Sequence, residues 1–239
     1  MPAVGADGAI WAVSTLLAAA GMSYAVRGRT STVFGPSVHC GDVRRRAVAL
    51  TFDDGPTPAT SMLLDLLDRY QAKATFFQCG ANVDRYPGVA RAVPARGHEI
   101  GNHSYSHPLL CFRSPAQVEA EIERAQATIT QVTGIIPTLF RAPFGVRWFG
   151  LRQAQRRLNL LGVTWTVLGR DWKLSARAVV ERVLARVHNG AIVCLHDGRA
   201  VEPAPDIGET IEAVRLLIPE LRKRGFALET VSQLLCPTN

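Results

Sequence analysis

The sequence lacks several patterns that define small, repetitive or nucleic-acid-binding proteins. Its five cysteines lie far apart and are odd in number, so they form neither a CxxC metal site nor a disulfide framework. We expect most of them to be free thiols. There is no internal repeat and no low-complexity tract, which argues against a solenoid. There is also no zinc-finger spacing, no basic region leading into heptads and no aromatic-rich RNA-binding strand, so we expect no nucleic-acid partner.

The composition is that of a globular protein with a large core. The chain has 239 residues, of which 47% are hydrophobic and 20% are charged, and this length favours one large α/β domain. Lys and Arg number 27 against 20 Asp and Glu, which gives a net charge of +7. A positive balance suits an anionic partner such as an envelope polymer or a membrane surface. The basic residues are scattered, however, and solvated helix faces explain most of them.

The N-terminal segment is apolar. Residues 8–26 carry no charge, and a helix of this length would extend about 28 Å, close to the thickness of a bilayer core. We therefore expect residues 1–27 to form a membrane anchor or signal-like segment that holds the protein on the extracytoplasmic face. Arg27 and Arg29 follow the segment and argue for the cytoplasmic orientation instead. A buried N-terminal helix is the other alternative, and nothing indicates the oligomeric state.

Beyond this segment, residues 28–46 are polar and predict a linker, and residues 47–235 predict the main domain. Apolar runs of strand type are expected at 47–52, 74–78, 99–102, 138–140, 164–168, 191–195 and 226–229. Amphipathic helices are expected at 60–70, 87–95, 114–132, 150–161, 176–187 and 207–224. This alternation predicts an α/β fold, a parallel sheet of about seven strands closed or nearly closed into a (β/α) barrel. A doubly wound open sheet is the alternative.

Two polar clusters that directly follow predicted strands could bind a metal ion. In TFDDGP, Asp53 and Asp54 leave the strand in different directions, so one carboxylate can ligate a metal while the other faces water or substrate. In HSYSH, His103 and His107 are four residues apart, and we expect them to meet on one side of a helical turn. With a carboxylate they would form a site of two histidines and one acid. Taken alone, each cluster is also compatible with an ordinary turn or with surface histidines.

Three further clusters follow later strands. Arg141 in RAPFG could clamp a carboxylate in a bidentate pair. His196 in CLHD ends a hydrophobic strand and could act as a general acid or base, with Asp171 of RDWK as its orienting partner. For the arginine cluster considered alone, a surface arginine before a loop is the alternative.

In order and placement, TFDDGP, HSYSH, RAPFG, RDWK and CLHD resemble the five motifs of the polysaccharide deacetylases, the NodB-homology domain of carbohydrate esterase family four. The resemblance extends over about 47–235. It implies a distorted (β/α) barrel that removes acetyl groups from N-acetylated sugars at a divalent-metal site. The metal ligands implied are Asp54, His103 and His107. Zn²⁺ is the first choice, with Co²⁺ or another divalent ion as the alternative.

The resemblance also implies roles for the remaining motif residues. Asp53 would be the general base, and His196 the general acid that protonates the departing amine. Arg141 would orient the base and Asp171 the acid. In addition, the resemblance implies substrate contacts from the backbone N–H of Phe144 to the oxyanion, and from Trp172 as a wall of the acetyl pocket.

Two of the five motifs depart from the family pattern. Cys194 stands where a leucine is usual, two residues before the histidine of the fifth motif, and Leu195 is adjacent to that histidine. We expect both to line the acetyl pocket, which could be slightly roomier. Ala142 and Phe144 replace the common Pro and Tyr of the third motif, which removes a phenolic hydroxyl and leaves the backbone N–H. Catalysis should survive these changes.

The expected function is therefore a metal-dependent N-deacetylase, a hydrolase of carbon–nitrogen bonds other than peptide bonds. Its glycan substrate would contain N-acetylglucosamine, as in peptidoglycan or chitooligosaccharide. One alternative keeps the fold but acts on a small amide, an imide or a lipid-linked sugar. Another is a glycan-binding protein without turnover.

Overall fold

The computed structural model describes residues 6–236, with side chains from residue 11 onward. Its strands are β1 Ser37–Val38, β2 Ala47–Asp53, β3 Thr75–Gln78, β4 Glu99–Asn102, β5 Leu139–Phe140, β6 Leu161–Val163, β7 Val167–Leu168, β8 Ala191–His196 and β9 Ala227–Leu228. Its α-helices are α1 Ala6–Arg27, α2 Thr60–Arg69, α3 Gly80–Arg85, α4 Pro87–Ala95, α5 Pro115–Thr133, α6 Leu151–Leu158, α7 Ala176–Leu184, α8 Gly208–Lys223 and α9 Val231–Leu235.

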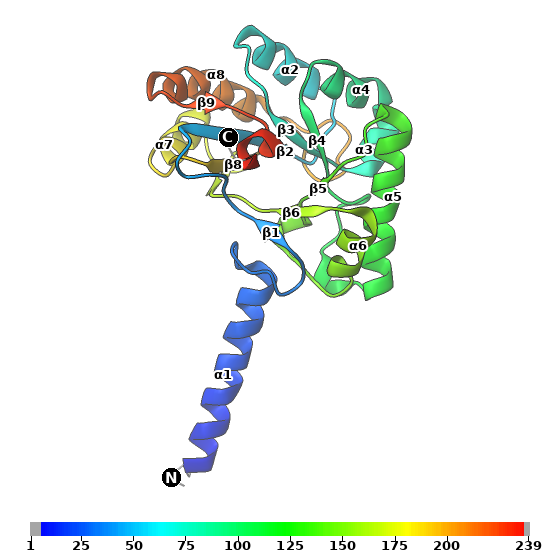
Figure 1. Ribbon diagram of the computed structural model, residues 1–239, viewed down its shortest axis with the longest axis vertical. Coiled ribbons are helices and arrows are strands. Elements are labelled where there is room, and N and C mark those ends of the chain that lie inside the picture. Colours follow the sequence, from blue (N-terminus) through cyan, green and yellow to red (C-terminus); the bar gives the residue numbers. More distant parts are fainter. Residues whose placement is uncertain (1–5, 237–239) are drawn as a thin grey trace.

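The strands form one curled parallel sheet in the order β1-β6-β5-β4-β3-β2-β8-β7, with β9 added beside β2. Figure 1 shows the helices around the outside of this curled sheet, with α7 and α8 toward one end, α5 toward the other, and α2 and α4 between them. The gap between the two ends of the sheet is crossed by the chain after β1. There Val38 O accepts from Thr164 N at 2.8 Å, and Gly190 O accepts from Gly41 N at 2.8 Å. The predicted distorted (β/α) barrel is confirmed.

The side chains of the central strands alternate between two cores, as the two-residue period of a strand requires. From β2, Val48, Leu50 and Phe52 pack in the outer core with the helices. Ala47 and Ala49 pack in the inner core instead. By the same parity, Asp53 at the end of β2 lies on the inner face. The barrel interior therefore ends in a carboxylate at the carboxyl edge of the sheet.

The structure differs from the predicted elements where strands are short. The segment expected to be a linker, 28–46, contributes β1, which pairs with β6. The helix expected to end at residue 161 ends at Leu158, because Asn159 adopts a left-handed φ of 53° and stops it. The helix expected from 114 begins as predicted, with a capping box between Ser114 and Gln117.

Helix α1 extends away from the rest of the molecule (Figure 1). Trp11, Leu16 and Leu17 are largely exposed on it. Among the helices of residues 11–236, none is both long enough and apolar enough to span a bilayer. The side chains of residues 8–10, which belong to the expected anchor, are not among those that the structure describes. Membrane association through 8–26 and the extracytoplasmic location stay predictions.

Candidate active site

The motif residues converge on one pocket at the carboxyl edge of the sheet. Its volume is about 550 Å³, within the usual range for small-ligand sites. The pocket is lined by Arg27, Asp53, Asp54, His103, His107, Phe144, Gly145, Trp165, Leu168, Trp172, Cys194, His196, Arg199 and Ala200. The clusters that lie far apart in the sequence are neighbours here because parallel strands all end at the same edge.

Asp54, His103 and His107 form a buried group of three ligand atoms. Asp54 Oδ1 lies 3.3 Å from His103 Nε2 and 3.0 Å from His107 Nε2. Asp54 and His107 have left-handed φ values of 76° and 56°. Non-glycine residues in this region are strained, and such strain clusters at functional sites. The backbone thus holds these side chains in place at a cost in stability.

The surroundings of the two histidines favour metal ligation. The Nδ1 of His103 lies 2.7 Å from the carbonyl oxygen of Arg141. This carbonyl can only accept, so Nδ1 carries the proton and Nε2 presents its lone pair to the site. The segment between the histidines is a loop rather than the predicted helical turn. Glu121 holds that loop by accepting from the backbone N–H of Ser106 at 2.8 Å.

The donor set fits a divalent cation. Asp54 Oδ1 is buried and receives no hydrogen bond. Burial by itself would raise the pKa of Asp54, but His103 and His107 hold it well below its usual value, so the carboxylate is ionised. One carboxylate oxygen and two imidazole nitrogens with room for further ligands are the arrangement of catalytic zinc sites.

Asp53 lies beside this group and is paired with a fully buried arginine. Arg141 Nη1 donates to Asp53 Oδ1 at 2.7 Å and to Thr51 Oγ1 at 2.7 Å. Its Nη2 donates to the carbonyl oxygen of Thr164 at 2.9 Å. The other Asp53 oxygen, Oδ2, accepts from Cys194 Sγ at 3.4 Å. The arginine therefore fixes the carboxylate, and Oδ2 remains turned to the pocket.

His196 and Asp171 form the second pair predicted from the sequence. His196 Nδ1 lies 2.9 Å from Asp171 Oδ1. Asp171 Oδ2 accepts from the backbone N–H of His196 at 2.8 Å and from Thr210 Oγ1 at 2.7 Å. Burial would lower the pKa of His196, but the hydrogen bond and charge of Asp171 raise it to about 9. The imidazole is thus protonated at neutral pH.

Aromatic rings border the site on two sides. The ring of Phe144 packs edge-on against His107 with centroids 4.6 Å apart. The ring of Trp172 packs edge-on against His196 at 4.9 Å. Both rings line the pocket and are about half exposed. The structure therefore places both where the sequence predicted substrate contacts, and their roles stay predictions.

The prediction that Leu195 lines the acetyl pocket is wrong. Leu195 is fully buried in the outer core, because it lies between Cys194 and His196 on a strand and must point to the opposite face. The two-residue period was the signal that could have excluded it.

Sequence reasoning also missed six residues that line the pocket, namely Arg27, Gly145, Trp165, Leu168, Arg199 and Ala200. Trp165 and Leu168 belong to the predicted strand 164–168, whose carboxyl end had to reach this edge. No comparable signal marked Arg27 or Arg199, which lie in segments without a motif.

Comparisons with known proteins agree with this geometry. The polysaccharide deacetylase family model matches residues 41–163. A chitooligosaccharide deacetylase of Bradyrhizobium sp. (strain ANU 289) is 38% identical over 204 residues, which cover 81% of this chain and 93% of that protein.

Solved structures show the same fold. The Bc1960 peptidoglycan N-acetylglucosamine deacetylase superposes with a TM-score of 0.78 at 29% identity, over 83% of this chain and 92% of that chain. A CE4 family pseudoenzyme from Bacillus anthracis, BA3943, superposes with a TM-score of 0.76 at 25% identity, over 85% of this chain and 70% of that chain. The family match covers half of the sequence, and the first relative matches over nearly its whole length. The chain belongs to the polysaccharide deacetylase family.

Proposed function

We propose that the chain is a metal-dependent hydrolase that removes N-acetyl groups from glycans containing N-acetylglucosamine, of the chitooligosaccharide or peptidoglycan type. The observation that carries the proposal is the meeting of a three-ligand group, Asp54, His103 and His107, with Asp53 and His196 in one pocket. The named activities of the deacetylase relatives supply the substrate class. Each of these deacetylase activities is the hydrolysis of a carbon–nitrogen bond other than a peptide bond.

The ligands would hold Zn²⁺ in preference to a harder ion, because two of the three are imidazoles. A bound divalent ion would polarise the amide carbonyl and make the attacking water more acidic. Asp53 Oδ2, which is not held by Arg141, would accept the proton of that water.

The remaining steps fall to residues on the other side of the pocket. His196, held protonated by Asp171, would donate its proton to the departing amine nitrogen, which cannot leave as an anion. The backbone N–H of Phe144 would stabilise the oxyanion, and Trp172 would enclose the acetyl methyl group. Arg141 and Asp171 are positioning residues, since each acts through its partner carboxylate or imidazole.

A binding protein without turnover is the second candidate, because one of the structures with this fold is of a pseudoenzyme. A binding protein has no need for a buried base–arginine pair or for an oriented, protonated histidine. This chain keeps both, which favours catalysis. A small amide or a lipid-linked sugar would use the same chemistry on a different substrate.

The test is release of acetate by the purified full chain from N-acetylglucosamine oligomers and from peptidoglycan. We expect acetate after loading with Zn²⁺, none after treatment with a chelator, and recovery on adding Zn²⁺ back. Asp53→Asn should lower the rate by about 10²–10⁴-fold. The matched control is Asp65→Asn, at an exposed carboxylate far from the pocket, which should keep the rate of the unaltered protein.

Failure would have a clear meaning. A folded, metal-loaded chain that released no acetate from either glycan would refute the proposal and favour a small-molecule or lipid-linked substrate. Acetate release that persisted in Asp53→Asn would refute the role of Asp53 as base.

A further inference from the structure

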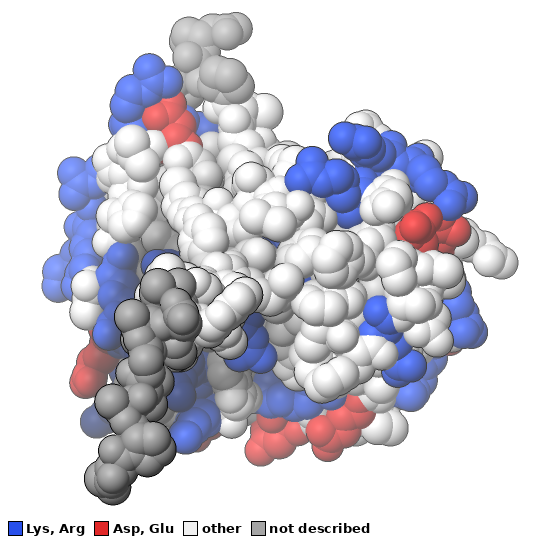
Figure 2. All heavy atoms as spheres, turned by 90° about the horizontal axis from the view of Figure 1, so that it is seen from below, with Lys and Arg blue, Asp and Glu red and all other residues white. Residues whose placement is uncertain are grey.

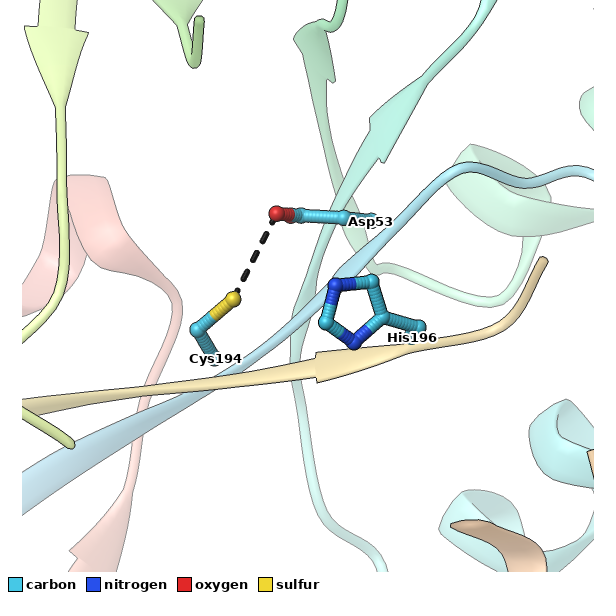
Figure 3. A group of neighbouring side chains, drawn as sticks. All are labelled: Asp53, Cys194 and His196. Atoms are coloured by element: carbon cyan, nitrogen blue, oxygen red, sulfur yellow. Dashed lines mark hydrogen bonds between the residues drawn. The ribbon is translucent and has the colours of Figure 1, made fainter. Parts of the chain in front are cut away.

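A second group of metal-ligating side chains lies beside the first. Asp53, Cys194 and His196 each offer a ligand atom, and these atoms all lie within 4.8 Å of one another. Figure 3 shows the sulfur of Cys194 directed at a carboxylate oxygen of Asp53, with the ring of His196 alongside. The three come from adjacent strands, since Asp53 of β2 is paired in register with His196 of β8.

Each of these side chains has an atom that its structural partner leaves free. Asp53 Oδ1 is held by Arg141, which leaves Oδ2 for another contact. His196 Nδ1 is held by Asp171, which leaves Nε2. Carboxylate–histidine pairs of this kind orient ligands in known metal sites. Cys194 Sγ has Oδ2 of Asp53 as its nearest side-chain partner, and the residue lines the pocket.

The spacing suits a tetrahedral ion. With a Zn–S bond of about 2.3 Å, a Zn–O bond of about 2.0 Å and a tetrahedral angle, the sulfur and oxygen lie about 3.5 Å apart. The observed separation of Cys194 Sγ and Asp53 Oδ2 is 3.4 Å. The open pocket beside them leaves the fourth position to water. A thiol, an imidazole and a carboxylate select Zn²⁺ or Co²⁺ over Mg²⁺ or Ca²⁺.

Two effects make the group of Asp53, Cys194 and His196 bind a metal ion more weakly than the group of Asp54, His103 and His107. Burial and the nearby Asp53 carboxylate raise the pKa of the Cys194 thiol well above its usual value. An incoming ion must therefore displace two protons to solvent as it binds: the thiol proton of Cys194 as the metal–sulfur bond forms, and the Nε2 proton of His196 as the metal–nitrogen bond forms. A cation already held by Asp54, His103 and His107 would also repel a second one nearby. The second group should fill only after the first, when metal is in excess.

We propose that Asp53, Cys194 and His196 form a second, inhibitory site for a thiophilic divalent ion. An ion bound there occupies both the base and the acid of the proposed reaction, so excess metal stops turnover. The inhibition rests on the proposed function, whereas the binding does not. The site depends on Cys194, one of the positions at which the chain departs from the family pattern.

The binding test is a titration of the metal-free full chain with Co²⁺, followed by absorption spectroscopy. The first ion should bind to nitrogen and oxygen ligands alone. The second should add a thiolate-to-cobalt charge-transfer band in the near ultraviolet. We expect two ions per chain in the unaltered protein, and one ion without the band in both Cys194→Ser and Cys194→Leu. Cys111→Ser, at a free thiol outside the group, is the matched control. It should still bind two ions per chain and show the charge-transfer band.

The inhibition test compares each protein with its own rate at one equivalent of Zn²⁺. Excess Zn²⁺ should lower acetate release by about 100-fold in the unaltered protein, because acid and base are lost together, and much less in the Cys194 variants. Retention of the second Co²⁺ and its band in both variants would overturn the site. Unchanged activity with the second site filled would overturn the inhibition. A chain that binds the second ion through Cys194 but releases no acetate would refute the proposed function and leave the site standing.

Discussion

Arg141 is the largest side chain that is fully buried in the described part of the molecule. Its charge is balanced by Asp53, and its guanidinium also packs 4.1 Å from the ring centre of Phe77. A charge in such a place is tolerated only when it is paired and hydrogen-bonded. The same contacts that make the barrel interior stable therefore fix the orientation of the proposed base.

Replacing this arginine should cost both stability and activity. Arg141→Met leaves the Asp53 carboxylate without its ion pair, and we expect the free energy of unfolding to fall by about 3–5 kcal/mol. Urea unfolding monitored by circular dichroism measures this. Arg113→Met, at an exposed position, should change it by no more than about 0.5 kcal/mol. Equal effects in the two variants would contradict the view that the buried pair is a structural element.

A second prediction at this scale concerns pH. His196 must be protonated to act as an acid, so activity should fall as the pH rises through its pKa, which Asp171 raises to about 9. Asp171→Asn removes the charge that raises this pKa. The alkaline limb of the rate profile should therefore move to lower pH. The profile of kcat against pH measures this, and a limb that stays in place would show that another group controls it.

Among the elements, the loops after β2 and β8 pack against each other closely at a glycine. A Cβ on Gly198 would lie 2.4 Å from the carbonyl oxygen of Asp54 and 2.6 Å from its carbonyl carbon. Because these are backbone atoms, the two loops would have to separate. Gly198→Ala should therefore displace the Asp54 ligand while leaving every proposed catalytic side chain in the sequence.

We expect Gly198→Ala to lower the free energy of unfolding by about 1–3 kcal/mol, as overpacking does, and to weaken Zn²⁺ binding. Gly88→Ala is the matched control, since a Cβ there meets nothing within 4 Å. It should be neutral or slightly stabilising, because alanine suits a helix better than glycine. Denaturant unfolding and Zn²⁺ titration check both variants. Tight Zn²⁺ binding in Gly198→Ala would contradict the proposed link between the loops.

How much of this the sequence could predict depends on the length of each element. The long runs of β2 and β8 and the capped helix α5 carry enough residues to show their period, and they lie where expected. β1, with two residues, and β6, with three, show no alternation, and only pairing with distant segments creates them.

The residues of the pocket also divide into those that the sequence could predict and those that it could not. The motif residues were predictable, because strand ends of a parallel sheet must meet. Arg27 and Arg199 reach the pocket from α1 and from a loop, which no local pattern in the sequence indicates. The pairing of Cys194 with Asp53 was likewise invisible, since it requires the register between two strands.

At the scale of the whole molecule, the main feature is the excess of positive charge. The chain carries a net charge of +7. Figure 2 shows Lys and Arg side chains around the edges of one face, without a single dense patch. Arg27 and Arg199 line the pocket itself. A field of this kind attracts anionic polymers over a distance set by the ionic strength.

This charge predicts that salt affects two substrates differently. Peptidoglycan bears carboxylates, whereas N-acetylglucosamine oligomers are neutral, yet both would meet the same catalytic groups. Raising the salt from about 0.05 M to about 0.5 M shortens the screening length roughly threefold. The KM for peptidoglycan fragments should then rise by roughly tenfold, while the KM for the neutral oligomers changes little. Because the neutral substrate controls for any effect of salt on the protein, an equal response of both would rule out electrostatic selection of the glycan.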